Sequence, residues 1–71
     1  PNDMEMSRGG VEDIIRQNKE NILNLQPGEG FDLFGIRFHM DHLCIPKLSY
    51  QEMQGDEQVH HTYRIDKKYL N

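Results

Sequence analysis

The stretch from Phe31 to Met40, FDLFGIRFHM, holds the densest group of large apolar residues in this chain of 71 residues. We therefore expect it to lie at the centre of the core. A period of two places Ile36 and Phe38 on one face, as in a strand. A period of 3.6 places Ile36 and Leu43 on one face, as in a helix. Periodicity therefore leaves helix and strand open for the segment from Phe34 to Leu43.

Before this stretch, the chain has the pattern of an amphipathic helix from Val11 to Leu25. Its apolar residues recur at helical spacing, with charged residues mostly on the other side. These apolar residues are Val11, Ile14, Ile15, Ile22 and Leu25. The turn-forming run from Gln26 to Gly28 ends the pattern. The sequence thus predicts one helix of about four turns.

After Pro46, the segment from Lys47 to Gln58 is predicted to be a short turn leading to a polar loop, and the run from Val59 to Ile65 alternates as a half-buried strand does. The predicted fold class is α+β: one long N-terminal amphipathic helix packed on a small β-hairpin or wing, as in a trimmed winged helix. Residues 1–10 contain turn formers without periodicity and are predicted to be a flexible arm. Residues 11–71 then form a single small domain.

Charge and composition narrow the classes of partner. The chain has twelve acidic and eight basic residues and a formal net charge of -4, which disfavours binding to phosphate backbones. The chain has no run of about eighteen apolar residues, so we expect no membrane contact. One cysteine cannot form an internal disulfide and fits a reducing, cytoplasmic compartment. A protein partner is the remaining expectation.

The residues from Asn24 to Leu33 resemble a Leu-x-Pro-Gly-Glu-x-Phe-x-Leu signature. It is found in short bacterial, phage and plasmid proteins with a winged-helix-like layout. In that family a helix with a Gly-x-x-Phe pattern follows, similar to Gly35–Phe38, and a wing strand ends in Tyr-Arg-Ile, as Tyr63–Ile65 does. The resemblance implies a winged-helix-like fold and a DNA-associated regulator, and for a protein-binding module it implies an inhibitor or adaptor of phage or plasmid type. The family has a polar, basic helical stretch between the signature and the Gly-x-x-Phe pattern. In this chain Phe34-Gly35 joins the two directly.

All four histidines and the cysteine fall in two short clusters. A structural zinc site needs three or four converging nitrogen or sulfur ligands. The candidate ligands here are His39, His42, Cys44 and His61. The spacing lacks the paired knuckles of strong zinc motifs, so we predict no cofactor and keep a zinc-stabilised domain as an alternative. The carboxylates are dispersed and no phosphate-cradling loop is present, so we expect no enzymatic activity.

These observations favour a small non-enzymatic protein-binding module of inhibitor or adaptor type. The alternatives are the winged-helix-like DNA regulator and the zinc-stabilised domain. Binding through apolar side chains not needed for the core would use Leu23, Tyr50 and Met53. Binding to phosphates would use the cations Arg64, Lys67 and Lys68 near the C-terminus.

Overall fold

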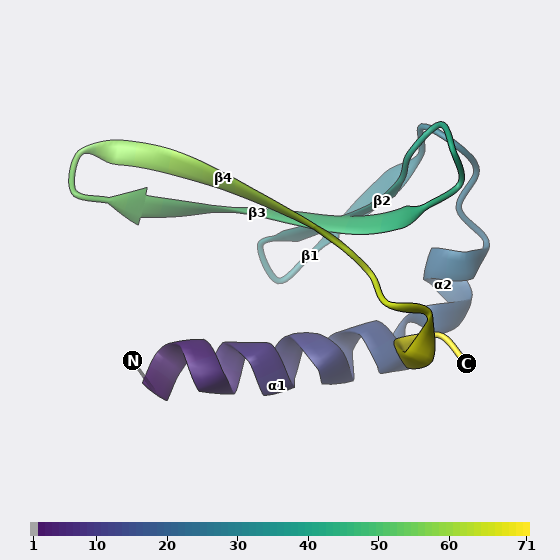
Figure 1. The fold of residues 1–71 in the computed structure, drawn as a ribbon, viewed down its shortest axis with the longest axis horizontal. Helices are drawn as coiled ribbons and strands as arrows, with labels where there is room; N and C mark the ends of the chain where they lie inside the picture. The colour runs from purple at the N-terminus through teal and green to yellow at the C-terminus, as the bar shows by residue number, and fades with distance from the viewer. Residues whose placement is uncertain (1) are drawn as a thin grey trace.

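The structure is a computed structural model that describes the backbone of residues 2–71 and the side chains of residues 10–71. Its elements follow one another along the chain as α1 (Asn2–Gln17), α2 (Lys19–Leu23), β1 (Gly30–Leu33), β2 (Ile36–Met40), β3 (Pro46–Gln54), β4 (Glu57–Arg64) and the 3₁₀ helix η1 (Lys67–Tyr69). The strands form one antiparallel sheet in the order β1-β2-β3-β4, and α1 lies along one side of it (Figure 1).

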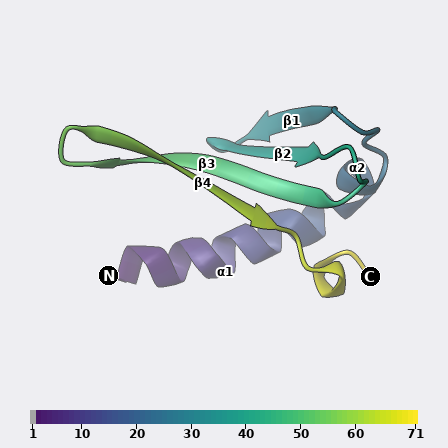
Figure 2. The ribbon, with the colours of Figure 1, turned by 45° about the horizontal axis from the view of Figure 1, so that its top comes forward.

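The β3–β4 hairpin extends well beyond the other two strands. β2 pairs with β3 only from Pro46 to Ser49, whereas β3 and β4 stay paired up to Gln54 and Glu57. Figure 2 shows the distal part of this hairpin projecting on its own above α1. Beyond Ser49, the edge of β3 that faces away from β4 is therefore not paired with β2.

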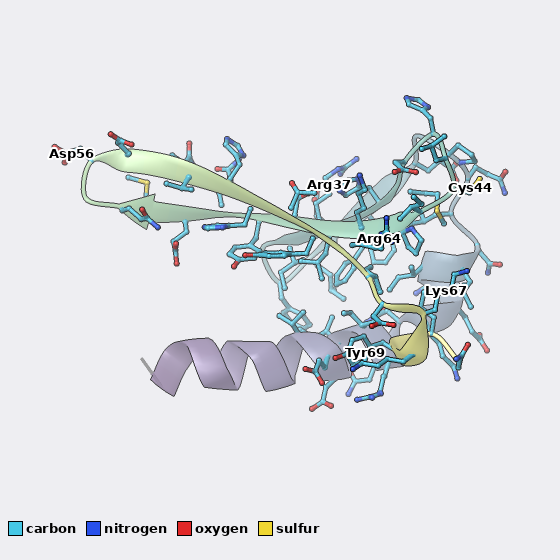
Figure 3. The ribbon with its side chains drawn as sticks, in the orientation of Figure 1. Arg37, Cys44, Asp56, Arg64, Lys67 and Tyr69 are labelled. Carbon is cyan, nitrogen blue, oxygen red and sulfur yellow. The ribbon has the colours of Figure 1, made fainter. Side chains whose placement is uncertain are left out.

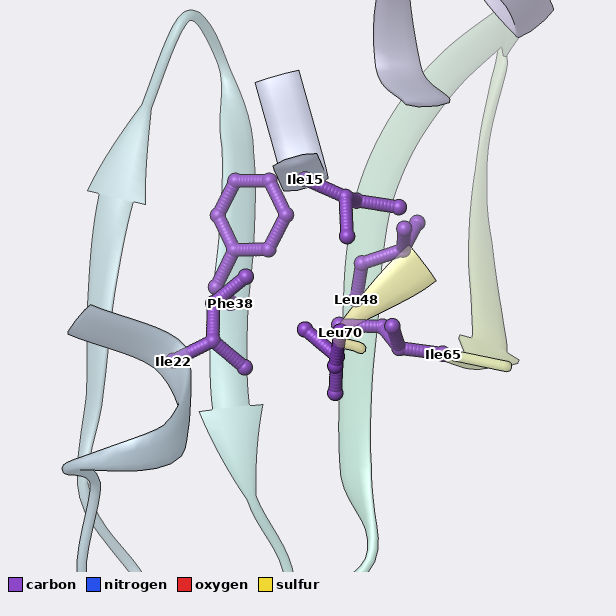
Figure 4. Close-up of a cluster of buried hydrophobic side chains, with 6 residues drawn as sticks. All are labelled: Ile15, Ile22, Phe38, Leu48, Ile65 and Leu70. Atoms are coloured by element: carbon purple, nitrogen blue, oxygen red, sulfur yellow. The ribbon is translucent and has the colours of Figure 1, made fainter. Parts of the chain in front are cut away.

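The core lies between the helices and one face of the sheet, which we call the inner face. Its buried side chains come from α1, α2, β2, β3 and the C-terminal residues (Figure 4): Ile15, Ile22, Phe38, Leu48, Ile65 and Leu70. Phe38 and Ile22 are fully buried, and Phe31 of β1 stacks on Phe38 with ring centroids 5.3 Å apart. The inner face therefore binds the helices through apolar contacts.

The predicted fold class is wrong. The body of the domain is a four-stranded antiparallel sheet, not a small hairpin or wing beside one long amphipathic helix. The Gly35–Phe38 segment, which the resemblance placed in a helix, forms the turn before β2 and most of β2 itself. The described residues therefore have no winged-helix arrangement.

The prediction of a single helix from Val11 to Leu25 is also wrong, because the helix is interrupted at Asn18. This residue has φ -113° and ψ 18°, and its side-chain amide donates to the carbonyl oxygen of Ile14 at 2.9 Å. Asn side chains compete in this way for backbone groups. The five-residue α2 then turns so that Ile22 enters the core.

Three further segments are decided by the structure. Residues 36–40 form a strand, which resolves the alternative between helix and strand. Residues 46–54 form β3, so the turn predicted after Pro46 is wrong, while Gly55 and Asp56 form the turn that joins β3 to β4. The predicted strand from Val59 to Ile65 is confirmed as β4. α1 also includes positions 2–10, assigned above to a flexible arm, and Pro1 lies outside the described residues; the mobility of the arm stays a prediction.

Candidate functional site

An open, largely apolar groove lies between α1 and the inner face. It has a volume of about 980 Å³ and lies where the hairpin continues beyond β2. Its apolar lining comes from α1, from the turn between β1 and β2, and from the hairpin: Val11, Ile14, Phe34, Ile36, Tyr50 and Tyr63. A concave apolar surface of this kind is typical of a binding site.

Phe34 is an unusual residue at the border of this groove. Together with Gly35 it forms the two-residue connection between the paired residues Leu33 and Ile36. Phe34 has φ 53° and Gly35 has φ 76°, as a type I′ turn requires, and the first position of such turns favours Asn, Asp or Gly. The Phe34 side chain is also 79% exposed. This phenylalanine thus adopts a left-handed backbone conformation and gains little burial within the chain.

An aromatic row covers the hairpin side of the groove. The rings of Tyr50 and His61 stack with centroids 4.9 Å apart, and Tyr50 and Tyr63 stack at 6.1 Å. The Nε2 atom of His61 lies 3.1 Å from Oε1 of Glu52. A hydrogen bond from Gln54 and then the one from His61 lower the pKa of Glu52, while burial raises the pKa of Tyr50. These contacts fix a flat ring surface beside the groove.

The opposite face of the sheet, which we call the outer face, is polar. Nε2 of His39 lies 3.0 Å from the Ser49 hydroxyl, which lies 3.1 Å from the Thr62 hydroxyl, so a hydrogen-bonded chain crosses three strands. Burial, and then the charges of Arg37 and Lys47, lower the pKa of His39. This row of hydrogen-bonded side chains has the form of a polar cross-strand ladder.

The residues predicted for protein binding lie apart. Tyr50 lines the groove, whereas Leu23 lies exposed on α2 and Met53 lies exposed near the tip of the hairpin. Of the predicted cations, Arg64 ends β4 beside the groove (Figure 3), while Lys67 and Lys68 belong to η1.

The candidate metal ligands do not converge either. His39 lies on the outer face of β2 and His61 on the inner face of β4. His42 and Cys44 lie in the loop between β2 and β3, and Cys44 is at the end of the molecule opposite to Asp56 at the hairpin tip (Figure 3). Within residues 10–71, no group of three or more His, Cys, Asp or Glu side chains has a geometry that could hold a metal ion.

The sequence analysis did not predict Phe34, Ile36 or Tyr63 as binding residues, although all three line the groove. A signal for Phe34 is present in the sequence, because Phe-Gly stands between two short alternating runs, which is the pattern of a hairpin with a two-residue turn. The groove itself has no such signal, since α1 and β4 are distant in sequence.

Comparisons with known proteins add no functional assignment. The chain matches no family model, no curated protein and no solved structure. In the described part of the chain, no helix is long and apolar enough to cross a membrane.

Proposed function

We propose that this protein is a non-enzymatic protein-binding module of inhibitor or adaptor type and that its groove takes an apolar segment of a partner protein. The observation that carries the proposal is Phe34, which combines a left-handed backbone with 79% exposure beside an apolar groove. Residues held in a strained backbone conformation cluster at functional sites. Aromatic side chains, phenylalanine included, are also enriched at protein–protein interfaces.

The surroundings of Phe34 support the same proposal. Tyr63 is 52% exposed, and with Tyr50 it gives the groove a rigid aromatic wall. Tyrosine adds large contact area at low conformational entropy, which suits protein recognition. The net charge of -4 argues against a nucleic-acid partner. A cytoplasmic location belongs to the proposal, supported by the one exposed, free cysteine.

Selection of random peptides on the immobilised protein tests the proposal. We expect peptides rich in large apolar residues, whose affinity falls at least about tenfold on Phe34→Asn, as expected for a hot-spot residue. Leu43→Ser is the matched control, because Leu43 is equally exposed at 79% and lies outside the groove. Peptides that bind both variants as well as they bind the natural chain would contradict the proposal.

A further inference from the structure

The outer edge of β4 is open. β4 is the last strand of the sheet and is bonded to β3 on one side only. In an antiparallel pair, the backbone groups of alternate residues point toward the partner strand. The amide of Ile65 donates to the carbonyl oxygen of Pro46 at 2.9 Å, so the odd-numbered residues point toward β3. The N–H and C=O groups of Gln58, His60, Thr62 and Arg64 therefore point away from the sheet.

The charged residues of this edge strand, Glu57 and Arg64, lie only at its two ends. Natural edge strands are kept short or carry charged residues, above all Lys, or Pro or a β-bulge. The eight residues of β4, EQVHHTYR, contain neither Pro nor Lys, and eight consecutive residue pairs join β4 to β3 without a bulge. The edge at the other side of the sheet, β1, has only four residues. β4 is thus the longest unpaired strand edge among the described residues, since β3 is unpaired on its other side only beyond Ser49.

The two sides of β4 differ, which defines the partner strand. On the inner side, Tyr63 lines the groove, the His61 ring stacks parallel to it, and Val59 follows on the same face. On the outer side, Arg64 and Lys47 lie directly opposite each other and give two adjacent cations, of which Lys47 also pairs with Oδ2 of Asp41 at 3.3 Å. His60 lies on the same side. Cross-strand neighbours stabilise a sheet when apolar residues meet apolar ones and opposite charges meet.

We propose that β4 binds an extended partner segment in which apolar residues alternate with Asp or Glu, by β-strand addition. This inference rests on the proposed protein-binding function and names the class of partner. The apolar side chains of the added strand enter the groove, and its carboxylates meet His60, Arg64 and Lys47. Main-chain hydrogen bonds supply affinity and the alternating side chains supply specificity.

A second copy of this chain fits the edge less well. Two β4 strands that pair antiparallel keep their outer faces on the same side, which places the Arg64 and Lys47 cations of both copies on one face. An acidic and apolar segment instead brings carboxylates to these cations.

Amide hydrogen exchange with a synthetic ten-residue peptide of alternating Ile and Glu tests the proposal. At a peptide concentration ten times the Kd, exchange of the outward amides of Gln58, His60, Thr62 and Arg64 slows about tenfold. Amides of the odd-numbered residues of β4 are already bonded to β3 and change little. Unchanged exchange at the outward amides under saturating peptide overturns strand addition.

Two N-methylated peptides provide a control that leaves the protein intact. One carries N-methyl groups on its Ile residues and the other on its Glu residues, so each blocks one edge of the strand. We expect one of the two to lose binding and the other to retain it. Equal affinity of both overturns the proposal, because an added strand is bonded along one edge only.

Within the protein, Thr62→Pro removes an outward N–H group, and Thr62→Val keeps it while losing the same side-chain hydroxyl. Pro is tolerated on edge strands, and the loss of one hydrogen bond weakens peptide binding about tenfold, whereas Thr62→Val stays within about twofold.

Slow exchange of the outward amides without peptide, increasing with protein concentration, assigns the edge to a second copy and overturns the partner proposed here. Selected peptides that depend on Phe34 but leave the β4 amides unprotected overturn strand addition while keeping the proposed function.

Discussion

Replacing Phe34 with Asn separates a residue kept for binding from one needed for folding. A left-handed backbone costs an ordinary L residue about 1–2 kcal/mol, and Asn adopts it more readily. Phe34 is 79% exposed, so about a fifth of a side chain of ~200 Å² is covered, or ~40 Å². At about 25 cal/mol per Å², the lost burial amounts to about 1 kcal/mol. The two terms nearly cancel, and we expect the free energy of unfolding to change by less than about 1 kcal/mol.

Urea unfolding followed by circular dichroism measures this change. Phe38→Ala is the contrasting variant, because Phe38 is fully buried and its truncation is expected to destabilise the fold by about 3–5 kcal/mol. Destabilisation by Phe34→Asn of more than about 2 kcal/mol would show that Phe34 is needed for folding, since it exceeds what the covered area of this side chain supplies.

Three further outcomes are expected. Asp41 accepts hydrogen bonds from the amides of Leu43 and Ile45, and that from Ile45 is the main cause of its lowered pKa. Asp41→Asn is therefore less stable than the natural chain above about pH 4, and the two converge as the pH falls through the lowered pKa; equal stability at pH 7 in urea unfolding contradicts this role. Ile22→Ala destabilises by about 2–5 kcal/mol, because this side chain has 0% exposure, whereas truncation of its exposed neighbour Leu23 changes stability by less than about 1 kcal/mol. Addition of EDTA leaves the circular dichroism spectrum unchanged, while a loss of structure restored by zinc would reinstate the metal alternative.

The sequence predicted the elements whose patterns are local. β4 was recognisable because Val59, His61 and Tyr63 alternate with polar residues. The high density of large apolar residues from Phe31 to Met40 located the core correctly. β3 was missed because its alternation consists of Leu48 and Tyr50 followed by Glu52, so the pattern fades where the strand leaves the core.

The helix break and the groove depend on less visible properties. The helical spacing of the apolar residues continues through Asn18, and only its hydrogen bond to Ile14 shows why the helix ends there. The groove arises because the hairpin continues beyond β2 while α1 lies alongside, which is a property of packing. Tyr50, predicted as a binding residue from its type and position, lines the groove. Leu23 and Met53, predicted together with it, do not.

The most direct test of the binding account is a methyl chemical-shift map of the isotope-labelled protein titrated with a selected peptide. If the groove binds the peptide, the methyl signals of Val11, Ile14 and Ile36 shift in a saturable manner, because these side chains line the groove. The methyl signals of Leu23 and Leu43, which lie outside the groove, stay in place. Saturable shifts confined to Leu23 or Leu43, with the groove methyls unmoved, would contradict the binding account.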